Sequence, residues 1–286
     1  MTPRVVLSIA GSDSGGGAGL QADLRTFAAW RVHGAVAVTA VTAQSTTAVT
    51  GVVAIDPAFV AQQVRTVTAD LEVAAVKTGM LADPDTVATV AGLAAEGLLP
   101  ELVVDPVLVS STGHPLMDEG GVEAYRELLI PRALVVTPNL RETAVLTRRP
   151  LSALSGVEAM AEAAQEIRAL GAAWVVVKGG HLGPEGAPDV LAGPDGVEVL
   201  AARRVETAND HGTGCSMSAA IAAQLALGVA PGRAVAEAKA FVHRGLVGSA
   251  GWRLGAGHGP IDHLGWAAHE PDRPPSPAAG PAGTRG

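Results

Sequence analysis

Residues 74–105 read AAVKTGMLADPDTVATVAGLAAEGLLPELVVD, and this stretch decides the fold class. Its short apolar runs at 74–78 and 102–105 predict buried strands, and the spacing of apolar residues over 84–96 predicts a helix between them. A strand, a helix and a second strand in this order are typical of a parallel sheet that is covered by helices.

The same alternation continues on both sides of this stretch. Further apolar runs rich in β-branched residues predict strands at 5–10, 36–42, 134–137 and 174–178. Helical spacing predicts helices at 19–30, 57–71, 156–170, 213–227 and 231–249, and 189–201 predicts a hairpin around Pro194-Asp195-Gly196. We therefore expect an α/β fold, a three-layer αβα sandwich whose central sheet is mostly parallel.

Composition narrows the classes of function. With 286 residues, of which 48% are hydrophobic, the chain can build one large α/β domain or two small ones. Its 28 acidic and 20 basic residues give a net charge of -8 without a dense basic run, so we expect no nucleic-acid partner. The apolar run at 5–10 is too short for a signal-peptide core or a membrane span, so we expect a cytoplasmic protein that does not bind membranes.

Residues suited to ligand binding follow the predicted strands. Gly11, Gln44, Lys77, Asp105 and Asn139 each lie just after an apolar run or at its last positions. In mostly parallel sheets, ligands bind beyond the carboxyl ends of the strands. We expect the functional site at this edge of the sheet.

Residues 211–223, HGTGCSMSAAIAA, pass from a glycine-rich turn into an alanine-rich helix that begins near Cys215, the single cysteine of the chain. The first N–H groups of a helix lack internal partners and lie at the positive end of its dipole, so we expect residues 212–215 to form an anion cradle. The same surroundings lower the pKa of a thiol, which would let Cys215 accept a proton from a substrate hydroxyl. The alternative is an inert, buried cysteine at a tight turn.

Several motifs together resemble those of a known enzyme family. Gly212-Thr213-Gly214-Cys215, followed by a helix of small residues, resembles a signature of the ribokinase superfamily, in which the pyrimidine-kinase branch carries cysteine at the fourth position. The run at 8–23, SIAGSDSGGGAGLQAD, is similar to the opening motif of that branch, and further similarity lies at 42–44, 77–81, 105–107, 137–142 and 178–181. From about residue 5 to 266 the chain resembles the hydroxymethylpyrimidine/phosphomethylpyrimidine kinases of thiamine biosynthesis.

This resemblance implies a ribokinase-like kinase domain over residues 1–268, and the Pro-, Ala- and Gly-rich composition that follows predicts a disordered tail at 269–286. The implied reaction is the ATP-dependent phosphorylation of 4-amino-5-hydroxymethyl-2-methylpyrimidine (HMP) to HMP phosphate and then to HMP diphosphate. Homodimers are usual in the family. The runner-up activity is that of a pyridoxal kinase, against which Gln44 argues, and a third class is a non-catalytic binding protein on the same fold.

Phosphoryl transfer from ATP needs a proton acceptor for the hydroxyl and preorganised donors for the moving phosphoryl group. By resemblance, Gly212, Thr213 and Gly214, together with the N–H of Cys215, would hold the developing charge. Cys215 would take the proton of the hydroxymethyl group.

Charged residues at the strand ends are assigned to ATP and Mg²⁺. Lys178 ends an apolar run, where its charge is costly unless it meets an anion, so a nucleotide phosphate and a solvated strand end are its two interpretations. The resemblance adds Asn139 to the nucleotide side. Asp105 and Glu142 are candidates for organising Mg²⁺ through water. Asp105 is equally interpreted as a helix or turn cap, and Glu142 as the acid of a capping box that begins at Asn139.

The acceptor pocket is assigned by its chemistry and by the resemblance. A carboxamide can both donate to and accept from the edge of an aminopyrimidine, and Gln44 fits this requirement. The resemblance places six residues around the acceptor: Gly11, Ala18, Asp23, Gln44, Met80 and Val107. Core packing is an equally good interpretation of Met80 and of Val107. We interpret glycines 15–19 as a mobile flap over the acceptor. His181 and His211 are interpreted as polar loop residues and not as bases.

Three places depart from the pattern of the family. Ser45 stands where asparagine is usual, which leaves the acceptor class unchanged. The loop at 109–113 has no lysine where many relatives carry one, which weakens the nucleotide assignment. Residues 206–210 differ from the Thr/His-rich form common before the cradle.

Overall fold

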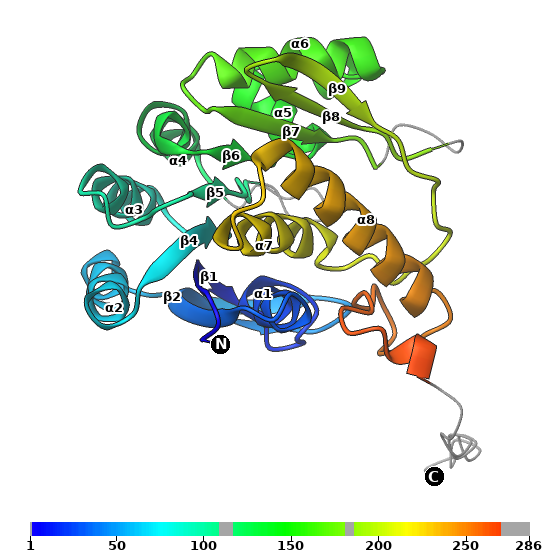
Figure 1. The fold of residues 1–286 in the computed structure, drawn as a ribbon, viewed down its shortest axis with the longest axis horizontal. Helices are drawn as coiled ribbons and strands as arrows, with labels where there is room; N and C mark the ends of the chain where they lie inside the picture. The colour runs from blue at the N-terminus through cyan, green and yellow to red at the C-terminus, as the bar shows by residue number, and fades with distance from the viewer. Residues whose placement is uncertain (1, 109–116, 181–185, 270–286) are drawn as a thin grey trace.

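One sheet of nine strands organises the part of the chain that the computed structural model describes, residues 2–108, 117–180 and 186–269 (Figure 1). Across the sheet the strands follow the order β3-β2-β1-β4-β5-β6-β7-β8-β9. Their bounds are β1 Val5–Ser12, β2 His33–Gln44, β3 Val49–Ala54, β4 Val73–Thr78, β5 Val103–Val104, β6 Val135–Val136, β7 Trp174–Lys178, β8 Asp189–Gly193 and β9 Gly196–Leu200. The helices are α1 Gly19–Ala29, α2 Pro57–Asp70, α3 Pro84–Ala95, α4 Glu119–Ala124, α5 Leu140–Thr147, α6 Val157–Arg168, α7 Thr213–Ala226 and α8 Pro231–Ser249.

The six neighbouring strands from β2 to β7 are parallel. Only the outer strands β3, β8 and β9 of this sheet, within the described ranges, pair in the antiparallel sense. This arrangement confirms the mostly parallel sheet, the predicted strands and the hairpin, which is β8–β9. Strand β3 was not predicted, because all six of its residues are exposed and no alternation of buried and exposed positions marks it.

Helices cover both faces of the sheet. Leu7 and Val104 belong to a core shared with α2, α3 and α6, whereas their neighbours Val6 and Val103 belong to a core shared with α1, α7 and α8. Successive side chains of a strand point to opposite faces, which explains why adjacent residues enter different cores. Figure 1 shows α2, α3 and α4 in a row along one side and α7 and α8 across the other. The three-layer αβα prediction is confirmed.

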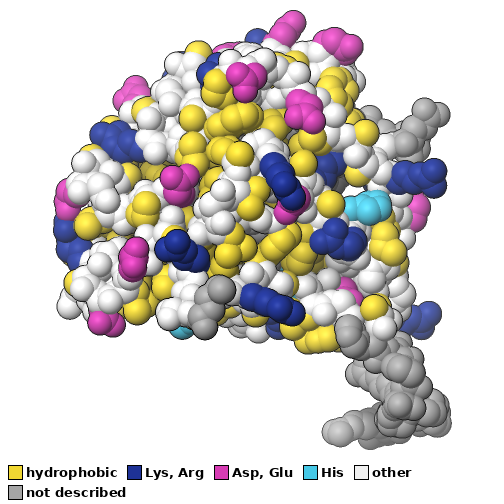
Figure 2. All heavy atoms as spheres, viewed as in Figure 1, with side chains coloured by type: hydrophobic (Ala, Val, Ile, Leu, Met, Phe, Trp, Pro, Cys, Tyr) yellow, Lys and Arg dark blue, Asp and Glu magenta, His cyan; other side chains and the backbone are white. Residues whose placement is uncertain are grey.

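Three sequence predictions fall wholly or mostly outside the described residues: the lysine-free loop at 109–113, His181, and the tail predicted at 269–286. No described helix is both long and apolar enough to cross a bilayer. On the face shown in Figure 2, Lys and Arg side chains lie singly and are interspersed with Asp and Glu.

Two glycines give opposite predictions for the stability of this fold. A Cβ at Gly193 in β8 would lie 2.1 Å from the ring of Trp174 on β7, whereas a Cβ at Gly92 in α3 would meet nothing within 4 Å. We expect Gly193→Ala to lower the free energy of unfolding by about 1–3 kcal/mol through overpacking. We expect Gly92→Ala, the matched control, to raise it by about 0.5–1 kcal/mol. Urea denaturation of the two variants measures both values, and equal effects would contradict this packing.

Candidate active site

The residues predicted at the strand ends meet at one edge of the sheet. β1, β4, β5, β6 and β7 are parallel, so their carboxyl ends share that edge. Helix α7 packs on β1, β4 and β5. At its first turn, a Cβ on Gly214 would lie 3.1 Å from Lys178 Nζ and 3.8 Å from Asp105 Oδ2. The predicted anion cradle therefore lies directly against the charged residues of the strand ends.

Gly212 determines the shape of the cradle. It caps the N-terminus of α7 with a φ of +80°, in the left-handed region that favours glycine. A Cβ at this position would also lie 2.0 Å from the carbonyl oxygen of Gly17, so the glycine-rich loop lies directly on the cradle. The N–H of Ser216 donates to the Gly212 carbonyl over 2.8 Å and closes the first turn. The turn admits no side chain at residue 212.

The expectation of a lowered pKa for Cys215 is wrong. Burial raises the pKa of its thiol to about 11. The charge of Lys77 and the N–H of Gly19 lower this pKa, but they offset only part of the effect of burial. The carboxylates of Asp23 and Asp105 raise the pKa further. Cys215 keeps part of its surface exposed, so the shift reflects water lost around the sulfur and not complete enclosure of the residue. At neutral pH the group is a thiol.

A fully buried ion pair provides the positive charge beside Cys215. Lys77 Nζ lies 2.8 and 2.9 Å from the two carboxylate oxygens of Asp23, and neither side chain has exposed surface. Ser8 Oγ donates to Asp23 over 2.6 Å. Burial alone would lower the pKa of Lys77, but the negative charges of Asp23 and Asp105 and the hydrogen bond to Asp23 raise it above its ordinary value. Lys77 therefore stays charged, and Asp23 holds it.

Asp105 is the second carboxylate of the site and is held by three donors. Lys178 Nζ and Thr137 Oγ1 lie 3.0 and 3.1 Å from its Oδ1, and Ser218 Oγ donates to its Oδ2 over 3.2 Å. Burial opposes ionisation, but the charges of Lys178 and Lys77 outweigh it and hold the pKa of Asp105 below its ordinary value. The Lys178 side chain is 14% exposed and that of Asp105 only 3%, so solvent reaches the lysine.

Glu142 and Asn139 form a capping box at the start of α5, which confirms the structural interpretation of this pair. Glu142 Oε2 accepts the N–H of Asn139 over 2.8 Å, and Asn139 Oδ1 accepts the N–H of Glu142 over 2.9 Å. Burial raises the pKa of Glu142 to about 8; Lys178 lowers it and Asp105 raises it. Asn139 also bridges Lys178 through the backbone, so this cap lies beside the charged strand end.

The carboxylates of Asp105 and Glu142 suit a magnesium ion that is held through water. Both oxygens of Asp105 already accept hydrogen bonds from protein groups, and Mg²⁺ keeps several of its waters in protein sites. Burial and the Asp105 charge raise the pKa of Glu142 to about 8, and a divalent cation beside the two residues would favour the ionised form of Glu142. Within the described ranges no three His, Cys, Asp or Glu side chains converge as a ligand set.

Gln44 and the glycine-rich loop meet on the other side of the cradle. Gln44 Nε2 lies 3.1 Å from His211 Nε2, which in turn lies 3.1 Å from Asp13 Oδ2. The Asp13 carboxylate also accepts the N–H groups of Gly15, Gly17 and Ala18, so the loop wraps around it. Burial opposes ionisation of Asp13, but the bonds from His211 and the loop outweigh it and hold its pKa below the ordinary value. The mobility of the flap stays a prediction.

The predicted acceptor residues occupy different depths. A Cβ on Gly11 would lie 2.6 Å from Met80 Cε, so these two are neighbours, and Met80 keeps part of its surface exposed. The Asp23 side chain has no exposed surface. Val107 follows Asp105, to whose carbonyl its N–H donates over 2.9 Å. Binding of the acceptor by the six residues stays a prediction.

Three contributors to this site were not assigned from the sequence. Lys77 was named among the residues at the strand ends but was given no role, although it carries the signal that singled out Lys178, a lysine in an apolar run. Asp13 before a glycine-rich stretch is a turn signal. Ser218 has no signal of its own, because its partner Asp105 is 113 residues away in the chain.

The buried pair of Lys77 and Asp23 makes the fold sensitive to one substitution. Lys77→Met would leave the Asp23 carboxylate buried and unpaired, so we expect a loss of about 3–5 kcal/mol in the free energy of unfolding. The double variant Asp23→Asn/Lys77→Met removes both charges and is expected to recover a large part of that loss. Chemical denaturation compares the variants, and a double variant no more stable than Lys77→Met would disprove the pairing.

Comparison with known sequences is consistent across the whole domain. A family model described as Phosphomethylpyrimidine kinase matches residues 13–262. A hydroxymethylpyrimidine/phosphomethylpyrimidine kinase from Rhizobium meliloti is 49% identical over 262 residues, which cover 91% of this chain and 97% of the relative. The protein of the same name from Streptomyces coelicolor is 43% identical over 270 residues, covering 94% of this chain and 97% of the relative.

Solved structures show the same fold. The ADP complex of pyridoxal kinase from Bacillus subtilis superposes with a TM-score of 0.84 at 37% identity and covers 93% of this chain and 100% of that one. Phosphomethylpyrimidine kinase from Clostridium difficile superposes with a TM-score of 0.73 at 36% identity, covering 84% of this chain and 97% of that one. These likenesses confirm the ribokinase-like fold expected from the sequence.

Proposed function

This chain belongs to the phosphomethylpyrimidine kinase family, and we propose that it transfers the γ-phosphoryl group of ATP first to HMP and then to HMP phosphate. The reaction serves thiamine biosynthesis and yields HMP diphosphate. We place it in the cytoplasm, with Mg²⁺ as the metal and without a nucleic-acid partner.

One observation carries this proposal most directly: the cradle at the start of α7 lies between a sulfur and a lysine–carboxylate pair. A Cβ on Gly214 would lie within 4 Å of both Lys178 Nζ and Asp105 Oδ2, and the next residue is Cys215. A phosphoryl group received by this turn has donors beneath it, a cation on one side and a proton acceptor on the other. These are the groups that phosphoryl transfer to an alcohol needs.

The residues divide the reaction between them. The hydroxymethyl oxygen of the acceptor attacks the γ-phosphorus, the bond to the β,γ-bridging oxygen breaks, and ADP leaves. The N–H groups at 212–215 stabilise charge on the moving phosphoryl group, and Lys178 neutralises the departing phosphates. The minor fraction of Cys215 that is ionised takes the alcohol proton, and the charge of Lys77 stabilises that thiolate. Mg²⁺ held near Asp105 and Glu142 would screen the triphosphate.

The acceptor is oriented by Gln44. Its carboxamide lies beside the residue that precedes the cradle, through the contact with His211. A carboxamide there can pair with the ring nitrogen and the amine of an aminopyrimidine. Met80 and Gly11 supply the adjoining surface.

Pyridoxal phosphorylation is the second candidate, because the Bacillus subtilis structure that resembles this chain is named a pyridoxal kinase. Gln44 favours the pyrimidine, since its carboxamide matches an amine that pyridoxal lacks. A coupled assay of ADP release with HMP, HMP phosphate and pyridoxal, each with ATP and Mg²⁺, separates the two. We expect the highest kcat/KM with the pyrimidines; faster turnover of pyridoxal would overturn the assignment.

Cys215→Ala is expected to slow the first phosphorylation by about 10²-fold or more. The second step is expected to change much less, because its acceptor is an anionic phosphate that needs little base. Since the pKa of Cys215 is about 11, the thiolate fraction rises with pH, so kcat/KM for HMP in the unmodified enzyme should increase about tenfold per unit between about pH 7 and 9.

The same slope should be absent with HMP phosphate and in Cys215→Ala. Steady-state kinetics across pH, with both acceptors, measure it. If Cys215→Ala phosphorylates HMP as fast as the unmodified enzyme does, Cys215 is not the base.

We also propose a homodimer formed through the β2–β3 hairpin. Val41, Val49, Val52 and Val53 are exposed by 49%, 54%, 53% and 66%, and β3 is an edge strand. Exposed apolar edges of this kind are covered in stable proteins, and a second copy is the commonest cover.

Light scattering tests this proposal. The protein is expected to have twice the monomer mass, and Val53→Asp is expected to shift it to the monomer. Val247→Asp, at a valine of α8 that is 56% exposed, is the matched control and should leave the mass unchanged. A monomeric unmodified protein would contradict the dimer.

A further inference from the structure

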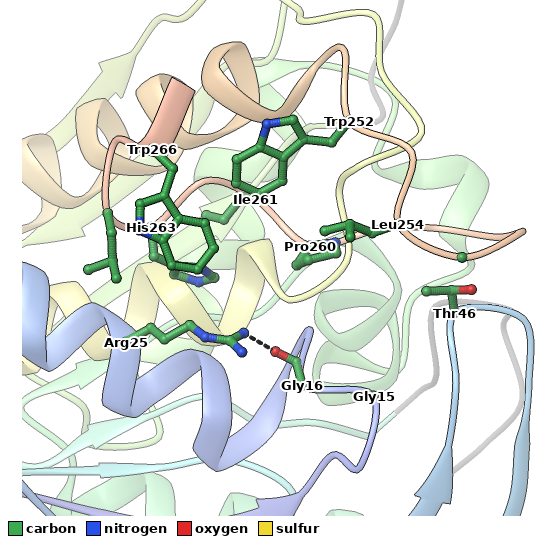
Figure 3. Close-up of a pocket in the computed structure, with 12 residues that line it drawn as sticks. Gly15, Gly16, Arg25, Thr46, Trp252, Leu254, Pro260, Ile261, His263 and Trp266 are labelled. Atoms are coloured by element: carbon green, nitrogen blue, oxygen red, sulfur yellow. Dashed lines mark hydrogen bonds between the residues drawn. The ribbon is translucent and has the colours of Figure 1, made fainter. Parts of the chain in front are cut away.

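The C-terminal segment 252–266 packs behind the cradle. Together with the Gly15–Gly16 turn and Arg25 of α1, it lines an open pocket of about 260 Å³ (Figure 3). In this view the Arg25 guanidinium reaches the carbonyl of Gly16, while Trp252 and Trp266 form the opposite wall. His263 lies in the wall between Arg25 and Trp266. The segment is therefore placed to act on the turn that carries the reaction.

This segment holds the cradle at both ends. Before the cradle, the N–H of His211 donates to the carbonyl of Gly259 over 3.0 Å, and His211 bridges Pro260. After the cradle, His263 Nε2 lies 2.8 Å from Ser216 Oγ. Ser216 Oγ is in turn 2.8 Å from the Gly212 carbonyl. His263 thus reaches the first residue of the cradle through one hydroxyl.

The environment of His263 fixes its imidazole in the neutral form. The residue is 5% exposed, and burial lowers its pKa to about 4. The charge of Arg25 on α1 lowers the pKa further, whereas the Ile261 carbonyl and Asp262 raise it. A neutral imidazole carries one ring N–H, and because the Ser216 hydroxyl donates its own hydrogen to the Gly212 carbonyl, Nε2 is the nitrogen that donates to Ser216 Oγ. Its hydrogen bond therefore has one geometry to impose on Ser216.

We propose that His263 is a positioning residue for phosphoryl transfer: through Ser216 it fixes the Gly212–Cys215 turn in the geometry that receives the γ-phosphoryl group. The inference rests on the proposed kinase function of this turn. His263 touches neither ATP nor the acceptor in this role. Positioning matters here because phosphoryl transfer depends almost entirely on alignment and charge stabilisation, and a displacement of 1 Å can cost about 10²-fold in rate.

The test compares His263→Leu, His263→Gln, Ser216→Ala and the double variant His263→Leu/Ser216→Ala. Leucine fills the space without a hydrogen bond, whereas glutamine can still present an amide to Ser216. The matched control is His33→Leu. His33 is exposed and is the first residue of strand β2, at the end opposite to Gln44. For each variant, kcat, the KM values for ATP and for the acceptor, and the melting temperature are measured.

We expect His263→Leu to lower kcat by about 10-fold to 10²-fold with little change in either KM. Ser216→Ala should give a similar loss, and the double variant should be no slower than the slower single variant, because both remove one linkage. His263→Gln should recover most of kcat, and His33→Leu should retain it.

A purely structural role predicts a different outcome, a lower melting temperature with kcat unchanged in the folded protein, and this would overturn the proposal. Multiplied losses in the double variant would overturn it as well. If His263→Leu does not fold, Ser216→Ala, a smaller truncation at the same contact, decides alone.

The substrate assignment can fail while the positioning role of His263 stands. If the unmodified protein turns over pyridoxal and not HMP, the substrate assignment fails while the positioning of the cradle is tested with pyridoxal. If it turns over none of the three acceptors, both are overturned.

Discussion

Two lysines that lie at the ends of buried strands impose the constraint on which the rest of the site depends. Lys77 in β4 is fully buried, and Lys178 ends β7 with a side chain that is mostly buried. A charge withdrawn from water is tolerated only when it is paired. Asp23 of α1 pairs with the first and Asp105 beyond β5 with the second, so the need for partners joins four elements at one edge of the sheet.

Most of the fold could be predicted from the sequence because its signal is local. Parallel strands covered on both faces are continuous apolar runs, and the helices between them repeat apolar residues every three or four positions. Strand β3 and the short helix α4 were not predicted, and α5 was indicated only by the capping-box interpretation of Asn139 and Glu142. β3 is wholly exposed, and α4 and α5 have only six and eight residues, too few for a clear period. The order of strands across the sheet is set by long-range pairing, which a local pattern does not contain.

The site residues likewise differ in whether their signal is local in the sequence. The cradle, Cys215, Asp105 and Lys178 were found from the sequence because each stands in a contiguous motif. The partners that give them their properties come from distant segments, as Lys77 does for Cys215. The direction of the pKa shift of Cys215 was wrong for this reason: a helix N-terminus favours the thiolate locally, but burial by other elements has the larger effect.

Charge balance at this edge indicates how a nucleotide would enter. Lys77 and Asp23 balance one another without exposed surface, so this pair is a fixed part of the fold. Lys178 and Asp105 also balance, but the lysine keeps contact with solvent. An incoming triphosphate would therefore compete for Lys178 and leave the Asp105 carboxylate in need of a new cation. Under the proposed function, a hydrated Mg²⁺ bound with ATP would supply that cation, so exchange of partners at Lys178 would couple phosphate binding to metal binding.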